Sequence, residues 1–194
     1  MSEGVVEFKN LSAKYSIHDQ LVLKDLSFRV EAGEKIGIVG RTGSGKSSLI
    51  KLVWKYLDPV NGSLVVDGVD IAKAYLKSYR NKISVVTQDT SLVYGTLREN
   101  LDPFNVHKDD QELVNYLKNL GLMNKEFLKS GLEMKIEGSG TNLSMGERQV
   151  IALARILLNP KKLIVLDEAT SSMDIKTEQF VQKEIEEKFR ALPC

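Results

Sequence analysis

The sequence has 194 residues, of which 42% are hydrophobic and 27% charged, and its formal net charge is +1. This size and composition fit one globular domain with a buried core, and the near-zero charge argues against a nucleic-acid-binding protein. A single cysteine excludes an internal disulfide framework and fits a reducing compartment. The opening residues form no apolar signal core, and no run approaches the roughly 20 apolar residues of a membrane-spanning helix. We therefore expect any role at a membrane to depend on a partner.

Taken in chain order, the hydrophobic pattern alternates between strands and helices. Strands are expected over the short apolar or alternating runs Val5–Leu11, Leu26–Val30, Lys35–Gly40, Leu64–Val66, Ile83–Thr87 and Leu163–Leu166. Helices are expected over the longer segments Gly45–Tyr56, Gln111–Leu120, Lys125–Leu132, Ser144–Leu158 and Ile175–Arg190. Turn signals flank the strand Leu64–Val66, at Asn61-Gly62 and Asp67-Gly68. Between Val93 and Asn142 strand patterns disappear, which indicates a helix-rich insertion. The alternation predicts an α/β fold with a mainly parallel sheet.

A phosphate-binding loop is predicted between the third expected strand and the first expected helix. The segment from Gly40 to Ser47 fits the pattern G-x-x-x-x-G-K-[ST] in the strand and helix context that the motif requires, which argues against an accidental glycine-rich turn. Its backbone N–H groups would face one concavity beside a helix N-terminus. Lys46 is expected to reach the β- and γ-phosphates, and the Ser47 hydroxyl to ligate Mg²⁺. The expected nucleotide-binding residues of this segment are Gly40, Thr42, Gly43, Ser44, Gly45, Lys46, Ser47 and Ser48.

An acidic pair, Asp167 and Glu168, follows the apolar strand Leu163–Leu166. Ligands of open α/β sheets bind at the carboxyl ends of the strands, so both side chains are candidates for the same site. Asp167 suits a Mg²⁺ contact through water, and Glu168 suits a general base that polarises the attacking water. The alternative is an ordinary acidic turn, and the phosphate loop upstream favours the catalytic interpretation.

The segment Leu143–Gln149 opens the long helix after the insertion. Ser144 and Glu147 form a capping-box pattern, which by itself predicts only a well-started helix. The same start can also present N–H groups and a hydroxyl to an anion. Here the sequence resembles the ATP-binding cassette family, whose signature is L-S-G-G-Q. The resemblance covers essentially the whole chain, and it also includes the phosphate loop, Gln88, the Asp167-Glu168 pair and the segment Ser171–Asp174.

The resemblance implies a fold and an assembly. The fold would be that of a P-loop NTPase, with a RecA-like, mainly parallel core and an antiparallel β subdomain in residues 1–92 and 160–194. An inserted helical subdomain with the signature helix would occupy residues 93–159. The implied ligands are ATP and Mg²⁺, and the implied partners are a second cassette and transmembrane domains, with no nucleic acid. The chain would then work at the cytoplasmic face of a membrane.

The resemblance also implies roles for single residues. Tyr15 would stack on adenine, and Gln88 would contact Mg²⁺ and the attacking water and sense the transmembrane coupling helices. Lys46, Gln88 and Glu168 would be catalytic, and Ser47, Gln88 and Asp167 would bind the metal. Ser144 and Gly146 would bind the γ-phosphate of ATP held by the opposite cassette. Ser171 and Asp174 would belong to the loop that communicates across the dimer.

The segments Gly95–Phe104 and Glu137–Leu143 resemble the second cassette of multidrug-resistance-associated (C-type) transporters, and Glu168 fits that assignment because the first cassette often lacks it. Met145 and Glu147 depart from the plain signature, which puts a close backbone approach and the local charge in question.

The family has a switch histidine after the strand that follows the glutamate. Neither His18 nor His107 matches it, and the sequence stops at Cys194. We therefore expect a C-terminally truncated cassette with impaired turnover. The alternatives are an ATP-binding module without turnover and a cassette ATPase outside transport, although the coiled-coil insertion or tandem linker usual in the latter is missing.

Overall fold

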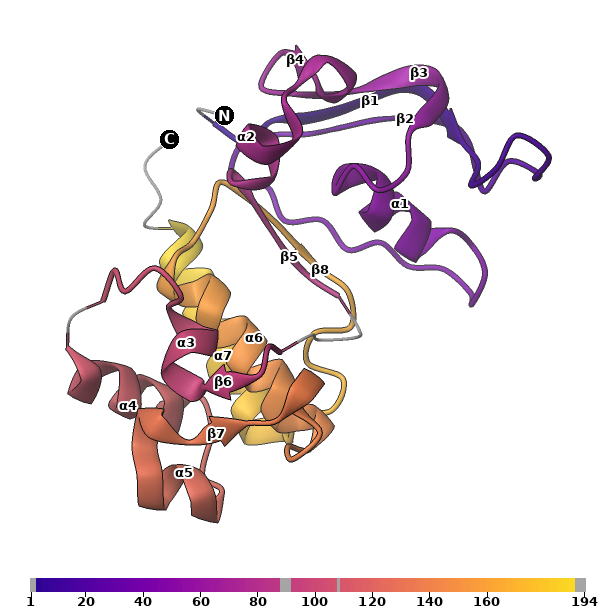
Figure 1. The fold of residues 1–194 in the computed structure, drawn as a ribbon. Helices are drawn as coiled ribbons and strands as arrows, with labels where there is room; N and C mark the ends of the chain where they lie inside the picture. Colours follow the sequence, from indigo (N-terminus) through magenta and orange to yellow (C-terminus); the bar gives the residue numbers. More distant parts are fainter. Residues whose placement is uncertain (1–2, 88–91, 108, 191–194) are drawn as a thin grey trace. The chain divides into compact units, whose positions relative to one another are not determined.

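The computed structural model describes residues 3–87, 92–107 and 109–190 (Figure 1). These residues form two compact units, of which the first comprises residues 3–85 and 161–167, and the second the described parts of 86–160 and 168–190. Each unit has its own cluster of buried apolar side chains. Within the described ranges, no helix is long and apolar enough to cross a bilayer.

An antiparallel sheet forms most of the first unit, with the strand order β2-β1-β3-β4. Its strands are β1 (Val6–Ala13), β2 (Leu23–Val30), β3 (Pro59–Val66) and β4 (Val69–Asp70). The Phe8 and Phe28 rings stack across β1 and β2 with their centroids 4.2 Å apart. Phe8 is buried in the apolar cluster of this unit, and Phe28 packs against that cluster from β2, whose alternating sequence predicts one apolar face. The antiparallel β subdomain that the resemblance implied is therefore present as a continuous sheet.

One of the two predicted turns is a bulge inside a strand. Asn61 and Gly62 lie within β3, at a register shift against β1, where Ser12 pairs with Asn61. Gly62 has φ of 71°, and a Cβ there would collide with the carbonyl oxygens of Lys9 and Asn10. Glycine at this position thus permits close backbone approach, and its sequence signal is easily mistaken for a turn. The second signal is a true hairpin turn, because Asp67 and Gly68 have positive φ and join β3 to β4.

The predicted parallel core is formed only in part, as a pair of strands. β5 (Ile83–Val86) pairs with β8 (Leu163–Leu166), and Figure 1 shows the two strands side by side. The unit also contains α1 (Lys46–Val53), the 3-10 turn Ile71–Lys73 and α2 (Leu76–Arg80). Leu163 and Val165 of β8 pack against the same apolar cluster as β1 and α1.

The strand predicted at Lys35–Gly40 is not formed, and this prediction is wrong for the structure. The segment is extended chain, and Ile36, Ile38 and Val39 are 47%, 49% and 97% exposed. A strand needs a neighbour that completes its hydrogen-bond ladder, and nothing in the described part of the chain pairs with this segment. Its apolar side chains match the composition of a buried strand, which explains why the sequence pattern predicted one.

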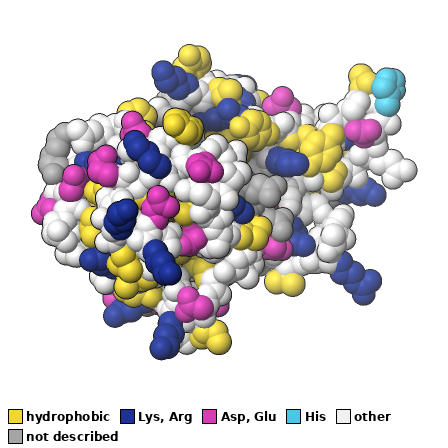
Figure 2. Space-filling model, turned by 60° about the horizontal axis from the view of Figure 1, so that its bottom comes forward, with side chains coloured by type: hydrophobic (Ala, Val, Ile, Leu, Met, Phe, Trp, Pro, Cys, Tyr) yellow, Lys and Arg dark blue, Asp and Glu magenta, His cyan; other side chains and the backbone are white. Residues whose placement is uncertain are grey.

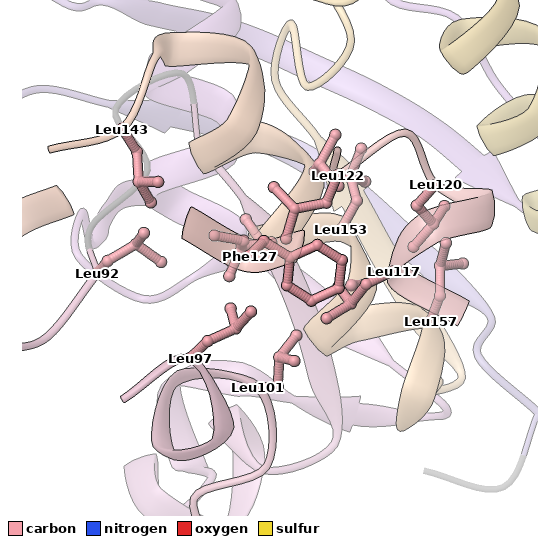
Figure 3. Close-up of a cluster of buried hydrophobic side chains, with 14 of the residues drawn as sticks. Leu92, Leu97, Leu101, Leu117, Leu120, Leu122, Phe127, Leu143, Leu153 and Leu157 are labelled. Carbon is pink, nitrogen blue, oxygen red and sulfur yellow. The ribbon is translucent and has the colours of Figure 1, made fainter. Parts of the chain in front are cut away.

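The second unit is mainly helical, with one very short pair of strands. Its elements are α3 (Leu97–Leu101), α4 (Asp110–Asn119), α5 (Lys125–Ser130), α6 (Met145–Leu158), α7 (Ile175–Arg190), and the paired strands β6 (Gly95–Thr96) and β7 (Lys135–Ile136). Two 3-10 turns, Gly131–Glu133 and Gly138–Gly140, precede α6. Figure 3 shows Phe127 of α5 among leucines of α3, α4 and α6, and these side chains are almost fully buried. The α6 helix packs against the other helices of this unit through this leucine-rich cluster.

Acidic and basic side chains are interspersed across the face drawn in Figure 2, with apolar patches between them. This distribution agrees with a net charge of +1 reached by 27 basic and 26 acidic residues.

Candidate functional site

The predicted phosphate loop lies directly before α1 in the first unit. Residues 40–45 form an irregular loop, and Lys46, Ser47 and Ser48 occupy the first turn of the helix. Gly45 is the N-cap with φ of 98°, and a Cβ there would lie 2.9 Å from the Val22 carbonyl oxygen. Only glycine fits this conformation and this approach without strain. The loop thus turns sharply into the helix, so that the first N–H groups of α1 point toward the loop.

The Lys46 ammonium lies over the loop itself. Its Nζ donates hydrogen bonds to the carbonyl oxygens of Gly40, at 2.7 Å, and Arg41, at 3.2 Å. The Ser44 backbone N–H also donates to the Arg41 carbonyl, at 3.1 Å, which closes the loop below the ammonium. A cation held at this place by neutral carbonyl groups can exchange them for phosphate oxygens, because charged acceptors bind it more strongly.

Tyr15 lies beside the same helix. Its hydroxyl and the Ser48 hydroxyl are 2.8 Å apart, and the Lys51 Nζ lies 5.2 Å from the centre of its ring. The Tyr15 side chain is 53% exposed, whereas Ser48 is buried. The structure thus brings Tyr15 to the first turns of α1, with part of its ring free to contact a flat ligand. Lys51, which the sequence reasoning missed, supplies a positive charge next to that ring.

The acidic pair follows β8, as predicted. Asp167 is half-buried and belongs to the first unit, while Glu168 is exposed and belongs to the second. Glu168 has φ of 50°, a left-handed conformation that is uncommon for a residue with a side chain. Gln88 lies outside the described residues.

The fit to Mg²⁺ is tested by the chemistry of the available donors. Among the residues that the structure describes, no three His, Cys, Asp or Glu side chains gather to hold a metal ion. Mg²⁺ in nucleotide sites needs no such cluster, since it takes one or two protein ligands, several waters and phosphate oxygens. The exposed Ser47 hydroxyl and the Asp167 carboxylate are donors of the required kind.

The signature segment forms the N-terminus of α6 in the second unit. Ser144 is the N-cap, and a complete capping box joins it to Glu147: the Ser144 hydroxyl accepts from the Glu147 N–H at 3.2 Å, and the Glu147 carboxylate accepts from the Ser144 N–H at 2.8 Å. Asn124, the N-cap of α5, donates a further hydrogen bond to this carboxylate at 2.6 Å. The Glu147 charge is therefore used inside the unit, which answers the question raised by its replacement of glutamine.

These contacts favour the ionised form of Glu147. Burial opposes ionisation, but the hydrogen bonds from the Ser144 backbone, the Asn124 side chain and the Ser144 hydroxyl outweigh it and hold the pKa of Glu147 below its ordinary value. Met145 beside it is 44% exposed and makes the signature surface more apolar than a glycine would.

The helix start and the segment after Glu168 are in direct contact. A Cβ on Gly146 would lie 2.8 Å from the Ser172 carbonyl oxygen, so the glycine permits this contact. The buried Gln149 side chain hydrogen bonds to the same segment, at Glu168, Ser171 and Ser172. Sequence reasoning did not single out Gln149. Its signal was a polar residue on the apolar stripe of α6, in step with Leu153 and Leu157.

Asp174 starts the last helix, α7. Its carboxylate accepts hydrogen bonds from the Lys176 and Thr177 N–H groups, at 3.0 and 3.1 Å, and from the Thr177 hydroxyl, at 2.7 Å. The Thr177 hydroxyl and the backbone hydrogen bonds hold the pKa of Asp174 below its ordinary value. Asp174 thus has a structural task in its own chain besides any role across a dimer.

Comparison with known proteins agrees with this arrangement. Residues 23–171 match the family model described as ABC transporter. The chain is 44% identical over 187 residues to ABC transporter C family member 3 of Dictyostelium discoideum, which covers 96% of the chain and 13% of that protein. It is 44% identical over 194 residues to multidrug resistance protein mrp-7 of Caenorhabditis elegans, covering 97% of the chain and 12% of the relative. The chain thus spans about an eighth of the length of these curated relatives.

A solved structure shares the fold. A bacterial Atm1-family ABC exporter with ATP bound superimposes with a TM-score of 0.85 and 31% sequence identity, over 95% of this chain and 33% of that one. Together with the phosphate loop, the capped signature helix and the acidic pair after β8, these similarities show that the chain belongs to the ABC transporter family, as an ATP-binding domain like those of the multidrug-resistance-associated members.

Proposed function

We propose that this chain binds MgATP at the phosphate loop and uses it to close against a second cassette. The observation that carries the proposal is the loop geometry: Lys46 Nζ rests on the Gly40 and Arg41 carbonyls at the start of α1, next to the exposed ring of Tyr15. Phosphate groups would take the place of those carbonyl contacts, and the purine would stack on Tyr15. The residues proposed to bind the nucleotide are Tyr15, Gly40, Thr42, Gly43, Ser44, Gly45, Lys46, Ser47 and Ser48.

The catalytic roles in this proposal follow from the chemistry of the side chains. Ser47 and Asp167 would hold Mg²⁺, which neutralises phosphate charge when bound. Glu168 would accept a proton from the attacking water, and Gln88 would orient that water and contact the metal. Ser144 and Gly146 would bind the γ-phosphate of ATP on the opposite cassette, so that each site is composite.

The assembly proposed here is that of an exporter. The chain would pair head to tail with a second cassette and attach to transmembrane domains at the cytoplasmic face of a membrane. The similarity to multidrug resistance protein mrp-7 and to the bacterial exporter supports this setting. The Gly95–Phe104 and Glu137–Leu143 segments, with Glu168, favour the second cassette of a C-type transporter. Within it we assign residues 1–92 and 160–194 to the core and residues 93–159 to the helical subdomain.

Turnover by this chain alone is proposed to be slow. In this scheme the signature that contacts the γ-phosphate must come from another molecule. A positioned group at the γ-phosphate is worth on the order of 10²–10³ in rate.

The test is the affinity for MgATP by calorimetry. Lys46→Ala should weaken binding by about 10–100-fold, because a charge-assisted hydrogen bond contributes about 1.5–3 kcal/mol. Lys24→Ala, which removes the same charge from an exposed position of β2, is the matched control and should bind as the parent does. Equal affinity of parent and Lys46→Ala would show that the loop is not the nucleotide site.

A further inference from the structure

Gln149 is the most deeply buried polar side chain of the signature helix, with 1% of its surface exposed. Its carboxamide is used at both ends. The Nε2 donates to the Glu168 carbonyl oxygen at 3.3 Å and to the Ser171 hydroxyl at 3.4 Å, and the Oε1 accepts from the Ser172 N–H at 3.1 Å. All these partners lie in the segment that begins with the proposed catalytic glutamate. A buried amide with both ends engaged fixes the position of what it binds.

The backbone of the segment 168–172 has an unusual conformation that has to be held by contacts. Glu168 has φ of 50°, and a left-handed residue with a side chain persists only where its surroundings hold it. Two donors meet its carbonyl oxygen, the Ser171 N–H at 3.2 Å and Gln149 Nε2. The first closes a local turn, and the second comes from a different element, α6. Gln149 is therefore the contact through which α6 holds the Glu168 backbone.

On the other side of this contact, Gln149 is close to the signature residues at the start of α6. Gln149 lies in the second turn of α6, after the Ser144 cap, and Gly146 packs against the Ser172 carbonyl. A shift of the helix start would therefore move the segment 168–172 with it.

We infer that Gln149 is a positioning residue that couples the two composite sites to which one chain contributes. This inference rests on the proposed function, in which Ser144 and Gly146 contact ATP on the partner while Glu168 acts on the chain's own ATP. Closure of the signature on the partner's ATP would be transmitted through Gln149 to the backbone of Glu168. The carboxamide touches no nucleotide in this scheme, so it acts on turnover and leaves binding alone.

The test compares the parent with Gln149→Met and Gln149→Glu. Methionine keeps the length and removes both hydrogen-bonding ends, while glutamate keeps an acceptor for the Ser172 N–H and loses the donor to Glu168. Gln182→Met, at an exposed position of α7, is the matched control. Three quantities are measured for each: MgATP affinity, hydrogen exchange of the Ser172 amide with and without MgATP, and hydrolysis in single turnover with the chain in excess, which detects slow rates.

In Gln149→Met, the hydrogen of the Ser172 amide should exchange about tenfold faster, because the amide loses one hydrogen bond. Its hydrolysis rate constant should fall at least about tenfold, because small misplacement of a catalytic group is costly, while MgATP affinity stays within about twofold. Gln149→Glu should restore protection of Ser172 but not the rate, a split that a general loss of stability does not produce.

The inference is overturned if Gln149→Met leaves Ser172 exchange unchanged, or if rate and affinity fall together. If the parent binds MgATP without hydrolysing it, the test is the effect of MgATP on exchange of the Ser172 amide. MgATP should slow this exchange in the parent and leave it unchanged in Gln149→Met, and any other result contradicts the coupling. A parent that fails to bind MgATP refutes the proposed function instead, while basal exchange still tests the Gln149 contact.

Discussion

Side chains expected to meet nucleotide or phosphate are held by partners within the protein. Lys46 rests on two loop carbonyls, the Tyr15 hydroxyl meets Ser48, and Ser144 shares a capping box with Glu147. The contacts of Tyr15 and Ser144 restrict the rotamers of these side chains, so that less entropy is lost on binding, whereas the Lys46 contacts are those that phosphate would replace. At the residue scale, the candidate site is therefore partly preorganised. Single substitutions can separate the contribution of each side chain to ligand binding from its contribution to the stability of the fold.

Tyr15 allows such a separation. Tyr15→Ala should weaken ATP binding by about 1–3 kcal/mol, the contribution of one base–aromatic stack, and GTP binding to a similar extent, since every purine has a π-face. Tyr15→Phe keeps the ring and loses only the Ser48 contact within the protein, so its affinity should stay closer to that of the parent than the affinity of Tyr15→Ala. Calorimetric titration with both nucleotides measures this, with the exposed Tyr75→Ala as control. Unchanged affinity in Tyr15→Ala would reduce Tyr15 to a packing residue.

Glu147 gives a prediction with a defined pH dependence. Its folded-state pKa is lowered, so its ionisation stabilises the fold above the unfolded pKa of about 4.3, and this contribution is lost as the pH falls through the folded value. Glutamine has a single side-chain oxygen, so Glu147→Gln leaves one of the two donors, the Ser144 N–H or the Asn124 side-chain amide, without an acceptor oxygen. It should cost about 1 kcal/mol at neutral pH, and the difference from the parent should vanish in acid. Urea unfolding at pH 7 and below pH 4 tests this, and a difference independent of pH would contradict it.

At the scale of elements, helix ends connect the site to the rest of each unit. The C-terminal end of α1, opposite the phosphate loop, is covered by α2. Arg80 donates to the carbonyls of Trp54, at 3.0 Å, and Lys55, at 3.2 Å, and its guanidinium lies over the Trp54 and Tyr56 rings. The last carbonyls of a helix need donors, and a cation at this end also favours the helix dipole. The α1 helix is thus held at both ends.

Arg80→Lys should destabilise the first unit by about 1–3 kcal/mol, because lysine cannot donate to two carbonyls and stack on the rings at the same time. The fluorescence of Trp54, the single tryptophan of the sequence, reports directly on this position during urea unfolding. Lys77→Ala, an exposed position of the same short helix, should leave the transition in place. A transition for Arg80→Lys that coincides with the parent's would show that α2 does not support α1.

Local signals predicted two elements well where the contacts that form the element are close in the sequence. Ser144 with Glu147 marked the start of α6, and Asp67-Gly68 the hairpin turn, because both depend on contacts a few residues apart. The strand at Lys35–Gly40 failed because a strand depends on a distant neighbour that the pattern cannot reveal. Gln149 was overlooked for a similar reason: its partners at 168–172 come together with α6 only through tertiary packing.

At the scale of the whole molecule, the expected site residues are divided between two compact units. The phosphate loop, Tyr15 and Asp167 belong to the first unit, and the signature and Glu168 to the second. In the proposed dimer, each chain would offer the first unit and Glu168 to its own ATP, and the signature to the partner's. Each dimer would contain two such contacts, one at each bound ATP. Dimer formation should therefore depend steeply on the concentration of ATP, since both sites contribute binding free energy at once.

This dependence is tested with Glu168→Gln, which should slow loss of the γ-phosphate and so let ATP bridge two copies. Light scattering at saturating MgATP should report a dimer for Glu168→Gln and a monomer when ADP replaces ATP. Adding Ser144→Asp should abolish the dimer, because aspartate still caps α6 but repels the partner's phosphate. Loss of two charge-assisted hydrogen bonds, at about 1.5–3 kcal/mol each, predicts a dissociation constant higher by about 10²–10⁴. A Glu168→Gln chain that stays monomeric at high concentration with bound ATP, or a double variant that still dimerises, would mean that the signature does not meet nucleotide across a dimer.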